Sequence, residues 1–280
     1  MIADFSLPGV ARKEALKVTI GQGVTSFTDT ITAEEPLEMI VAATRGQEVS
    51  AGIIMRTPVM DDCLAAGFLF TEGIVRGMND ISAIEGIGSD GVSHENSIKV
   101  TLAENVRLQP GNMGGRRYIN SSCGVCGKGS IDQVFLRAGK IQRSGLRISS
   151  SVIASLPEAL WETQGIFSRT GGIHAAGIFR SDGSLVCSAE DVGRHNAVDK
   201  VIGRSLMNGY KFDHMILQVS GRAGFEIIEK AAVAGIPVIG SISAPSSLAV
   251  ETCETLGITL LGFIRGKSFN IYSGPQRIIL

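Results

Sequence analysis

Two cysteines three positions apart are the residues of this chain best suited to chemistry. They lie in the segment Ser121-Ser122-Cys123-Gly124-Val125-Cys126-Gly127-Lys128. Such a pair can bind one metal ion, close a disulfide or carry a transferable sulfur, and the thiolate is the reactive form in each case. Positive neighbours raise the thiolate fraction, and Lys128, Arg116 and Arg117 are available for this. The glycines beside the pair favour a mobile segment, which suits a thiol that must visit two partners.

Three kinds of site remain open for this pair on residue types alone. A closed zinc site needs two further ligands, the chain has no second C-x-x-C, and His174 and His195 are the candidate completions. A thioredoxin-type redox pair starts a helix after a strand, whereas this pair lies in a glycine-rich stretch. Sulfur transfer is the third. The remaining cysteines fall in apolar or helical patterns and are predicted to be buried free thiols: Cys63, Cys187 and Cys253.

Small, hydroxyl and basic residues follow three predicted strands of the C-terminal half. The loops are Ser220-Gly221-Arg222, Ser243-Ala244-Pro245-Ser246-Ser247 and Arg265-Gly266-Lys267-Ser268. Ligands of open α/β sheets bind beyond the carboxyl ends of the strands, and two of these loops lead into helix N-termini, which favour anions. Neither G-x-G-x-x-G nor G-x-x-x-x-G-K-[ST] occurs. The three loops together predict a ligand that bears phosphate.

Two histidines sit beside glycines at predicted element ends. They occur in Gly171-Gly172-Ile173-His174 and in Glu190-Asp191-Val192-Gly193-Arg194-His195-Asn196. At such positions His174 and His195 either reach a cleft or serve as satisfied structural histidines. Helix capping would explain one of the two acidic residues that precede the helix near Arg194.

Hydrophobic patterns predict the elements that position these residues. In the N-terminal part they indicate strands at 36–43, 50–56 and 98–102, with a helix from Asp61 onward. A helical stretch over 146–161 is expected to break near Pro157. The C-terminal elements follow in order: a hairpin of 172–180 and 185–189, a helix over 194–207, and strands at 214–219, 237–242 and 258–264 that alternate with helices at 222–234 and 246–256.

This alternation implies parallel βαβ units, so the fold class is α/β, or α+β for the whole chain. We expect a small mixed α+β domain at 1–115, a flexible C-x-x-C loop at 116–130 and an α/β domain at 131–280.

Composition excludes several classes of protein. The 280 residues carry 26 basic and 27 acidic side chains, and this balance argues against broad binding to nucleic acid. No apolar run reaches the roughly 18 residues of a membrane helix, and no secretory signal is apparent at Met1-Ile2-Ala3-Asp4-Phe5. Five cysteines are an odd and sparse set for a disulfide scaffold, so a reducing cytoplasm is expected.

The motifs together resemble the formate dehydrogenase accessory sulfurtransferase family. Beyond the C-G-x-C-G segment they comprise Thr57-Pro58, Leu69-Phe70-Thr71-Glu72-Gly73, Glu190-Asp191-Val192-Gly193-Arg194-His195-Asn196-Ala197-Val198-Asp199-Lys200, Ser220-Gly221-Arg222, Ser243-Ala244-Pro245-Ser246-Ser247-Leu248-Ala249 and Leu261-Gly262-Phe263-Ile264-Arg265-Gly266. The resemblance runs from about residue 34 to 275, and the long central motif makes it specific. The first thirty-odd residues add little to it.

The resemblance implies a cytoplasmic, homodimeric sulfur carrier. Such proteins take sulfur from a cysteine desulfurase as a cysteine persulfide. They pass it to the molybdenum (or tungsten) bis-guanine-dinucleotide cofactor before the cofactor enters formate dehydrogenase. By position, Cys123 would carry the persulfide with Cys126 as its partner. The cofactor, or a guanine nucleotide fragment such as GDP, would contact Phe263, Ile264, Arg265, Gly266, Lys267 and Ser268, with Ser220, Gly221, Arg222, Ser243, His174 and His195 as weaker candidates.

The family's second domain is similar in fold to cytidine deaminases, an α/β/α sandwich. Zinc deaminases use H-x-E followed by P-C-x-x-C, but here the cysteine pair precedes the histidines and His174 is followed by two alanines. Base deamination is therefore disfavoured. Two rival functions remain: a non-catalytic cofactor-binding chaperone, and a dithiol oxidoreductase with a stable Cys123–Cys126 disulfide.

Overall fold

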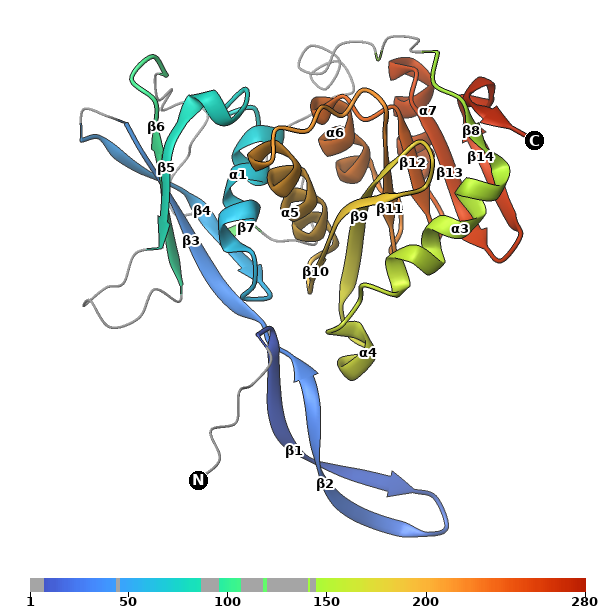
Figure 1. Ribbon diagram of the computed structural model, residues 1–280. Coiled ribbons are helices and arrows are strands. Elements are labelled where there is room, and N and C mark those ends of the chain that lie inside the picture. Colours follow the sequence, from blue (N-terminus) through green and yellow to red (C-terminus); the bar gives the residue numbers. More distant parts are fainter. Residues whose placement is uncertain (1–7, 44–45, 87–95, 107–117, 120–140, 142–144) are drawn as a thin grey trace.

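The structure is a computed structural model that describes residues 8–43, 46–86, 96–106, 118–119, 141 and 145–280. A six-stranded sheet lies in the C-terminal half, a five-stranded sheet in the N-terminal half, and a two-stranded ribbon projects away from them (Figure 1). The short strands β8 (Ile148–Ser149) and β15 (Ile278–Ile279) pair separately. Cys123 and Cys126 lie outside the described residues.

The larger sheet is mixed and has the strand order β10-β9-β11-β12-β13-β14. Its three central strands run parallel, while the β9–β10, β9–β11 and β13–β14 pairs are antiparallel. The strand bounds are β9 (His174–Arg180), β10 (Leu185–Asp191), β11 (Met215–Val219), β12 (Val238–Ser241), β13 (Thr259–Arg265) and β14 (Ser268–Ser273).

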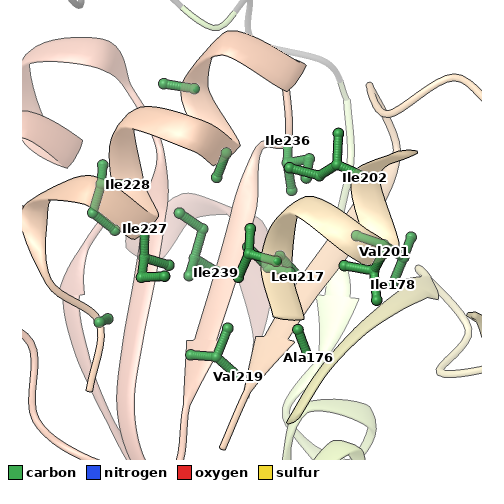
Figure 2. Packing of buried hydrophobic residues seen from close by; sticks show 14 of the residues in the cluster. Ala176, Ile178, Val201, Ile202, Leu217, Val219, Ile227, Ile228, Ile236 and Ile239 are labelled. Atoms are coloured by element: carbon green, nitrogen blue, oxygen red, sulfur yellow. The ribbon is translucent and has the colours of Figure 1, made fainter. Parts of the chain in front are cut away.

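Helices cover both faces of this sheet. One face carries α5 (Arg194–Met207), α6 (Phe225–Ala234) and α7 (Ser247–Leu256), and the other carries α3 (Ser150–Trp161). Successive strand residues point to opposite faces, so β11 sends Leu217 toward the three helices and Ile216 toward α3. Figure 2 shows part of the first cluster, in which aliphatic side chains from strands and helices interlock.

The run β11–α6–β12–α7–β13 forms two parallel βαβ units, as the sequence pattern predicted. β11 and β12 are buried along their whole length, which explains their nearly continuous apolar sequences. The predicted helix at 194–207 and the hairpin of β9 and β10 are also confirmed.

The smaller sheet has the order β5-β6-β3-β4-β7 and packs against α1 (Asp61–Thr71). Its core combines Leu37, Met39 and Val100 from the strands with Leu64 and Leu69 from the helix. The strand bounds are β3 (Glu35–Ala42), β4 (Glu48–Arg56), β5 (Ile81–Gly86), β6 (Ser97–Leu102) and β7 (Tyr118–Ile119), with a 3₁₀ turn η1 (Met78–Asp80) before β5 and another, η3 (Pro275–Arg277), before β15. The predicted strands and the helix from Asp61 are present, whereas the exact domain boundaries stay a prediction.

Helices α1 and α5 join the two halves at very close range. A Cβ atom added to Gly67 would overlap the carbonyl oxygen of Asp199, and one added to Gly203 would overlap that of Cys63. Only glycine lets the two backbones approach this closely, so each helix contributes one at the contact. The two halves are therefore packed as a continuous body along this helix pair.

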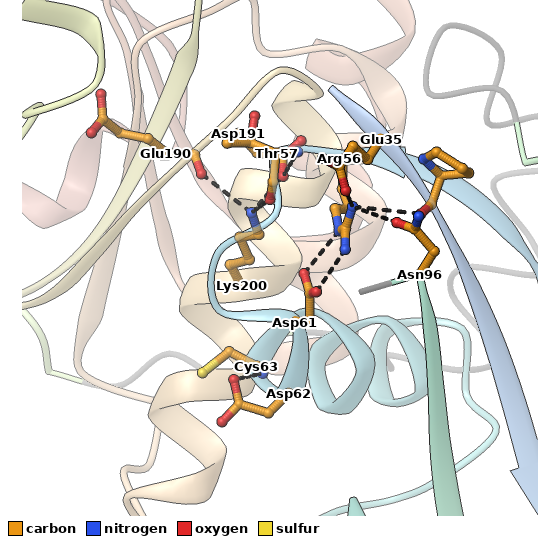
Figure 3. Close-up of polar contacts among 11 residues, drawn as sticks. Glu35, Arg56, Thr57, Asp61, Asp62, Cys63, Asn96, Glu190, Asp191 and Lys200 are labelled. Carbon is orange, nitrogen blue, oxygen red and sulfur yellow. Dashed lines mark hydrogen bonds and ion pairs between the residues drawn. The ribbon is translucent and has the colours of Figure 1, made fainter. Parts of the chain in front are cut away.

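A buried polar cluster completes the junction (Figure 3). The ammonium of Lys200 lies 2.5 Å from Oδ2 of Asp191 and donates to the carbonyl of Thr57 at 3.0 Å, and both charged side chains are inaccessible to solvent. The amide nitrogens of Thr57 and Gly193 donate to the same carboxylate at 3.1 and 2.7 Å. Thr57 follows β4, so the cluster ties the N-terminal sheet to β10 and α5.

Two features differ from the sequence predictions. α3 is one continuous helix from Ser150 to Trp161, so the expected break near Pro157 is wrong. Ile153, Leu156 and Leu160 of this helix are fully buried, and their packing outweighs the roughly 3 kcal/mol cost of an internal proline. The second difference is the ribbon of β1 (Val10–Thr19) and β2 (Gly23–Thr32), in a region for which no element was predicted.

Within the described residues, no helix has both the length and the apolar character needed to cross a bilayer.

Replacing Lys200 with methionine is expected to lower the free energy of unfolding by about 3 kcal/mol or more, because Asp191 would stay buried without its counter-ion. Lys99→Met is the matched control, since Lys99 pairs with Glu48 on the surface and such pairs contribute about 1 kcal/mol at most. Urea unfolding followed by circular dichroism measures both. Equal losses in the two variants would contradict this role of the buried pair.

Candidate functional site

The loops after β11, β12 and β13 lie together at one edge of the large sheet. Ser241 Oγ donates to the Gly221 carbonyl at 2.7 Å, and the Phe263 amide donates to the Ser243 carbonyl at 3.1 Å. Arg265 Nε donates to the Ile242 carbonyl at 3.3 Å. The structure thus brings together all three loops that the sequence singled out, and hydrogen bonds fix their relative positions.

The loop between β13 and β14 exposes most of its predicted residues but not all of them. Phe263 has a φ of 52°, a left-handed conformation uncommon for a non-glycine residue, and its ring lies 5.9 Å from the Arg265 guanidinium. Gly266, Lys267 and Ser268 are exposed in the hairpin turn and its exit. Ile264, in contrast, is fully buried in the core beneath α3. Its side chain therefore supports the loop from below.

A hollow of about 510 Å³ opens beside these loops. Two of the predicted residues line it, His174 and Ser220. The remaining lining residues were missed by the sequence analysis, and they come from the end of α3, from α4 (Phe167–Thr170) and from neighbouring turns: Trp161, Gln164, Phe167, Gly171, Gly172, Ile173, Val192 and Ile242.

Two aromatic rings form one wall of this hollow. Trp161 and Phe167 meet edge to face with ring centroids 5.1 Å apart, and 58% of Trp161 is exposed. It is the one tryptophan in the chain, but only the fold shows that its ring is exposed beside the hollow. An open indole face of this kind can stack on a planar ring.

Gln164 is the most unusual polar residue of the hollow. Only 5% of it is exposed, and its side-chain amide makes no hydrogen bond to any residue in the described part of the chain. The amide is accessible to solvent at the wall of the hollow, where it can pair with water or with a bound molecule. Because Gln164 lines the hollow, the hydrogen-bond donor and acceptor of its amide are available to a molecule bound there.

His174 contributes a neutral imidazole. Burial, reinforced by the charge of Arg194, lowers the pKa of His174 below its usual range. A Cβ atom on Gly221 would lie 3.2 Å from Nδ1 of this histidine, so the glycine permits the close approach of the loop. Ser220 is fixed beside it, since its hydroxyl accepts from the Ala175 amide at 2.9 Å.

His195 lies elsewhere. It is 6% exposed, and Nε2 lies 3.8 Å from Oε2 of Glu226 at the start of α6. It is not among the residues that line the hollow. Its predicted contact with a cofactor stays a prediction.

The long central motif acts mostly as a scaffold for the hollow. The Glu190 carboxylate accepts from the Ile166 and Phe167 amides at 2.9 and 2.7 Å, and so it fixes the start of α4. Asp191 belongs to the buried cluster with Lys200. The expectation that one acidic residue caps the following helix is wrong, because the N-cap of α5 is Gly193 and no side chain caps that helix. Asp191 accepts from the amide of Gly193, while Glu190 binds the start of α4.

The three described cysteines are buried free thiols, as predicted. Burial raises the pKa of Cys63 to about 12 and also raises the pKa of Cys187 and of Cys253. Within the described residues, no three His, Cys, Asp or Glu side chains gather at one point. Because Cys123 and Cys126 lie outside this part of the chain, their predicted roles remain predictions.

Comparisons with known proteins extend this picture. The FdhD/NarQ family model matches residues 32–279. The chain is 50% identical to a sulfur carrier protein FdhD of Thermoplasma volcanium, with both chains covered completely. It is 43% identical to the protein of the same name from Streptomyces coelicolor, over 96% of this chain and 95% of that one.

A crystal structure from Desulfotalea psychrophila, of a protein proposed to be a formate dehydrogenase accessory protein, superposes with a TM-score of 0.74. It covers 97% of this chain and all of that one at 23% identity, which supports the fold. The family match spans most of the described fold, including the loops and the hollow. This chain belongs to the FdhD/NarQ family.

Proposed function

We propose that this protein is a sulfurtransferase that serves formate dehydrogenase. One observation carries the proposal: the chain is 50% identical, over its whole length, to a protein named as a sulfur carrier. The paired cysteines at 123 and 126 supply the chemistry such a carrier needs. In this role the chain takes sulfur from a cysteine desulfurase and passes it to the molybdenum or tungsten bis-guanine-dinucleotide cofactor, which then enters the dehydrogenase.

The proposed transfer begins with a thiolate. The Cys123 sulfur attacks the outer sulfur of the donor's persulfide, a new S–S bond forms on Cys123, and the donor leaves as a thiolate. Two electrons stay with the leaving sulfur, so this exchange needs no outside oxidant or reductant. The rate depends on the thiolate fraction and on access to the cysteine.

The setting of this reaction is also part of the proposal. The six-stranded sheet with helices on both faces would be a cytidine-deaminase-like core, used here for carrying sulfur and not for deamination. The chain would work as a homodimer in the cytoplasm.

The cofactor's nucleotide end would occupy the hollow beside the strand-end loops. Trp161 offers an aromatic face, and the side-chain amide of Gln164 offers both a donor and an acceptor for the edge of a base. Arg222, Arg265 and Lys267 are exposed at the same sheet edge and carry charge opposite to that of pyrophosphate. A planar base attached to phosphates matches each of these features.

A cofactor-binding chaperone without sulfur transfer is the second candidate, since the hollow by itself would suffice for binding. Its cysteine pair would bind zinc or only order a loop. A third candidate, a dithiol oxidoreductase, would hold a stable Cys123–Cys126 disulfide. The fate of sulfur on Cys123 separates the three.

Incubation with a cysteine desulfurase and cysteine is expected to add the mass of one sulfur atom to the chain. The gain should be reversed by reductant and absent from Cys123→Ala, and intact-protein mass spectrometry measures it. Cys187→Ala is the matched control and should keep the gain, because burial keeps that thiol protonated. No gain on the native chain, or equal gain on Cys123→Ala, would favour the chaperone.

GDP is expected to quench the fluorescence of Trp161, the one tryptophan of the chain. Gln164→Ala should weaken GDP binding by about fivefold, because a hydrogen bond of about 1 kcal/mol would be lost. Gln22→Ala, in the exposed turn of the ribbon, should leave the affinity unchanged. Equal GDP affinities of the native chain and Gln164→Ala would contradict the proposed placement of the base in the hollow.

A further inference from the structure

One continuous segment of the chain forms a wall of the hollow. Residues 164–172 run from the turn after α3 through α4, and four of them line the hollow: Gln164, Phe167, Gly171 and Gly172. α4 itself has four residues. A helix this short is unstable by itself, because isolated helices of fewer than about 12 residues are marginal in water. The position of this wall therefore comes from its contacts with other parts of the fold.

The first of these contacts is the Glu190 carboxylate at the end of β10. One of its oxygens accepts from the Ile166 amide at 2.9 Å and the other accepts from the Phe167 amide at 2.7 Å. Ile166 is the N-cap residue of α4, and its aliphatic side chain cannot cap a helix. A carboxylate that accepts two hydrogen bonds fixes direction as well as distance. Glu190 does not itself line the hollow, so it would act on a ligand through the wall.

The carboxylate is presented from a rigid part of the large sheet. Glu190 lies opposite Ala175 in the β9–β10 pair, and its carbonyl accepts from the Lys200 ammonium at 3.4 Å. The next residue, Asp191, belongs to the buried cluster. Groups held on strands position their partners more precisely than groups on loops. The start of α4 is therefore fixed relative to the sheet and to the strand-end loops.

The second contact comes from the base of the β1–β2 ribbon. The Thr32 hydroxyl oxygen lies 3.0 Å from Oγ1 of Thr170 and 3.2 Å from the carbonyl oxygen of Gly172. Thr170 in turn donates to the Ile166 carbonyl at 3.0 Å. A Cβ atom added to Gly9 would lie 2.8 Å from Cδ1 of Ile166, so the chain entering the ribbon packs against the start of α4. Both ends of this short helix are held by residues distant in sequence.

The ring of Phe167 reports where the wall lies. It meets Trp161 edge to face, with ring centroids 5.1 Å apart. Trp161 belongs to α3, which is fixed to the sheet by its own buried side chains. A displacement of α4 would therefore change the contact between the two rings. Because the chain has one tryptophan, its fluorescence and near-ultraviolet circular dichroism follow this contact in the ligand-free protein.

We propose that Glu190 and Thr32 are positioning residues of the hollow, which hold residues 164–172 where a ligand can bind without touching that ligand themselves. A wall that spends less time in place lowers the apparent affinity in proportion to the competent fraction. A residue of the ribbon thereby influences binding in the hollow through α4. The effect on nucleotide affinity rests on the proposed function, whereas the placement of the wall does not.

Two substitutions of Glu190 test the geometry of the contact. Glu190→Gln keeps the reach and one accepting oxygen, whereas Glu190→Asp keeps the charge and loses one methylene of reach. The Kd for GDP, measured by quenching of Trp161, should rise by about threefold in Glu190→Gln and by about tenfold in Glu190→Asp. The near-ultraviolet circular dichroism of Trp161 should weaken in the same order without GDP. Glu251→Gln, on the exposed surface of α7, is the matched control and should change neither quantity.

Thr32→Val tests the other support and guards against loss of folding. It removes one hydroxyl and keeps the branched shape that favours a strand. The Kd for GDP should rise by about threefold with a similar change in the ligand-free spectrum. Thermal unfolding, followed by far-ultraviolet circular dichroism, should shift by a few degrees at most. Thr25→Val, in the exposed part of the same strand, is the control and should leave affinity and spectra unchanged.

Two results would overturn the proposal. Unchanged ligand-free spectra in all three variants would show that other contacts hold the wall. Native GDP affinity in Glu190→Asp would show that the charge matters and not the reach. A native chain whose Trp161 does not respond to GDP would instead contradict the nucleotide placement under the proposed function, and the ligand-free spectra would still decide whether Glu190 and Thr32 hold the wall.

Discussion

The buried salt bridge between Lys200 and Asp191 connects the N-terminal sheet to the C-terminal sheet and its helix α5. Lys200 comes from α5, Asp191 from the end of β10, and both bind the backbone of Thr57, which follows β4. In a low-dielectric interior these groups must satisfy each other, so their positions are tightly defined. The end of β4, the end of β10 and α5 are therefore joined at one point. The neighbouring Asp199 joins α5 to two further helices in the same way. Its carboxylate lies 2.8 Å from the ammonium of Lys230 in α6 and accepts from the hydroxyl of Thr71 in α1 at 2.8 Å.

This junction also determines the shape of the hollow. Glu190 precedes Asp191 on β10 and fixes the first residues of α4, which carries Phe167. Val192 follows Asp191 and lines the same hollow. Three consecutive residues thus connect the buried charge cluster to two walls of the candidate site. The long motif at residues 190–200 is, in the described structure, mainly the framework of the candidate site. Most residues that line the hollow come from α3, α4 and neighbouring turns.

The sequence predicted regular elements well where burial dictates the pattern. The βαβ run and α5 are defined by apolar residues at helical or strand spacing, and the three polar loops follow from where those strands end. Pro157 was misread because local propensity cannot show that Ile153, Leu156 and Leu160 would be packed on a sheet. The ribbon escaped for the opposite reason, because its alternation serves no core within the described chain. Trp161 and Gln164 were missed because their meaning depends on neighbours distant in sequence.

Burial lowers the reactivity of the three cysteines that the structure describes. Sulfur exchange requires a thiolate, and the protein interior disfavours that charge most where solvent is excluded. Cys63 and Cys253 are buried, and Cys187 donates to the carbonyl of Val201, so the raised pKa values keep all three thiols protonated near neutral pH. The proposed sulfur transfer would therefore use Cys123 or Cys126, which the sequence places in a glycine-rich segment with basic neighbours. The core of this fold therefore does more than hold the site, because it removes from the reaction every cysteine that the described structure contains.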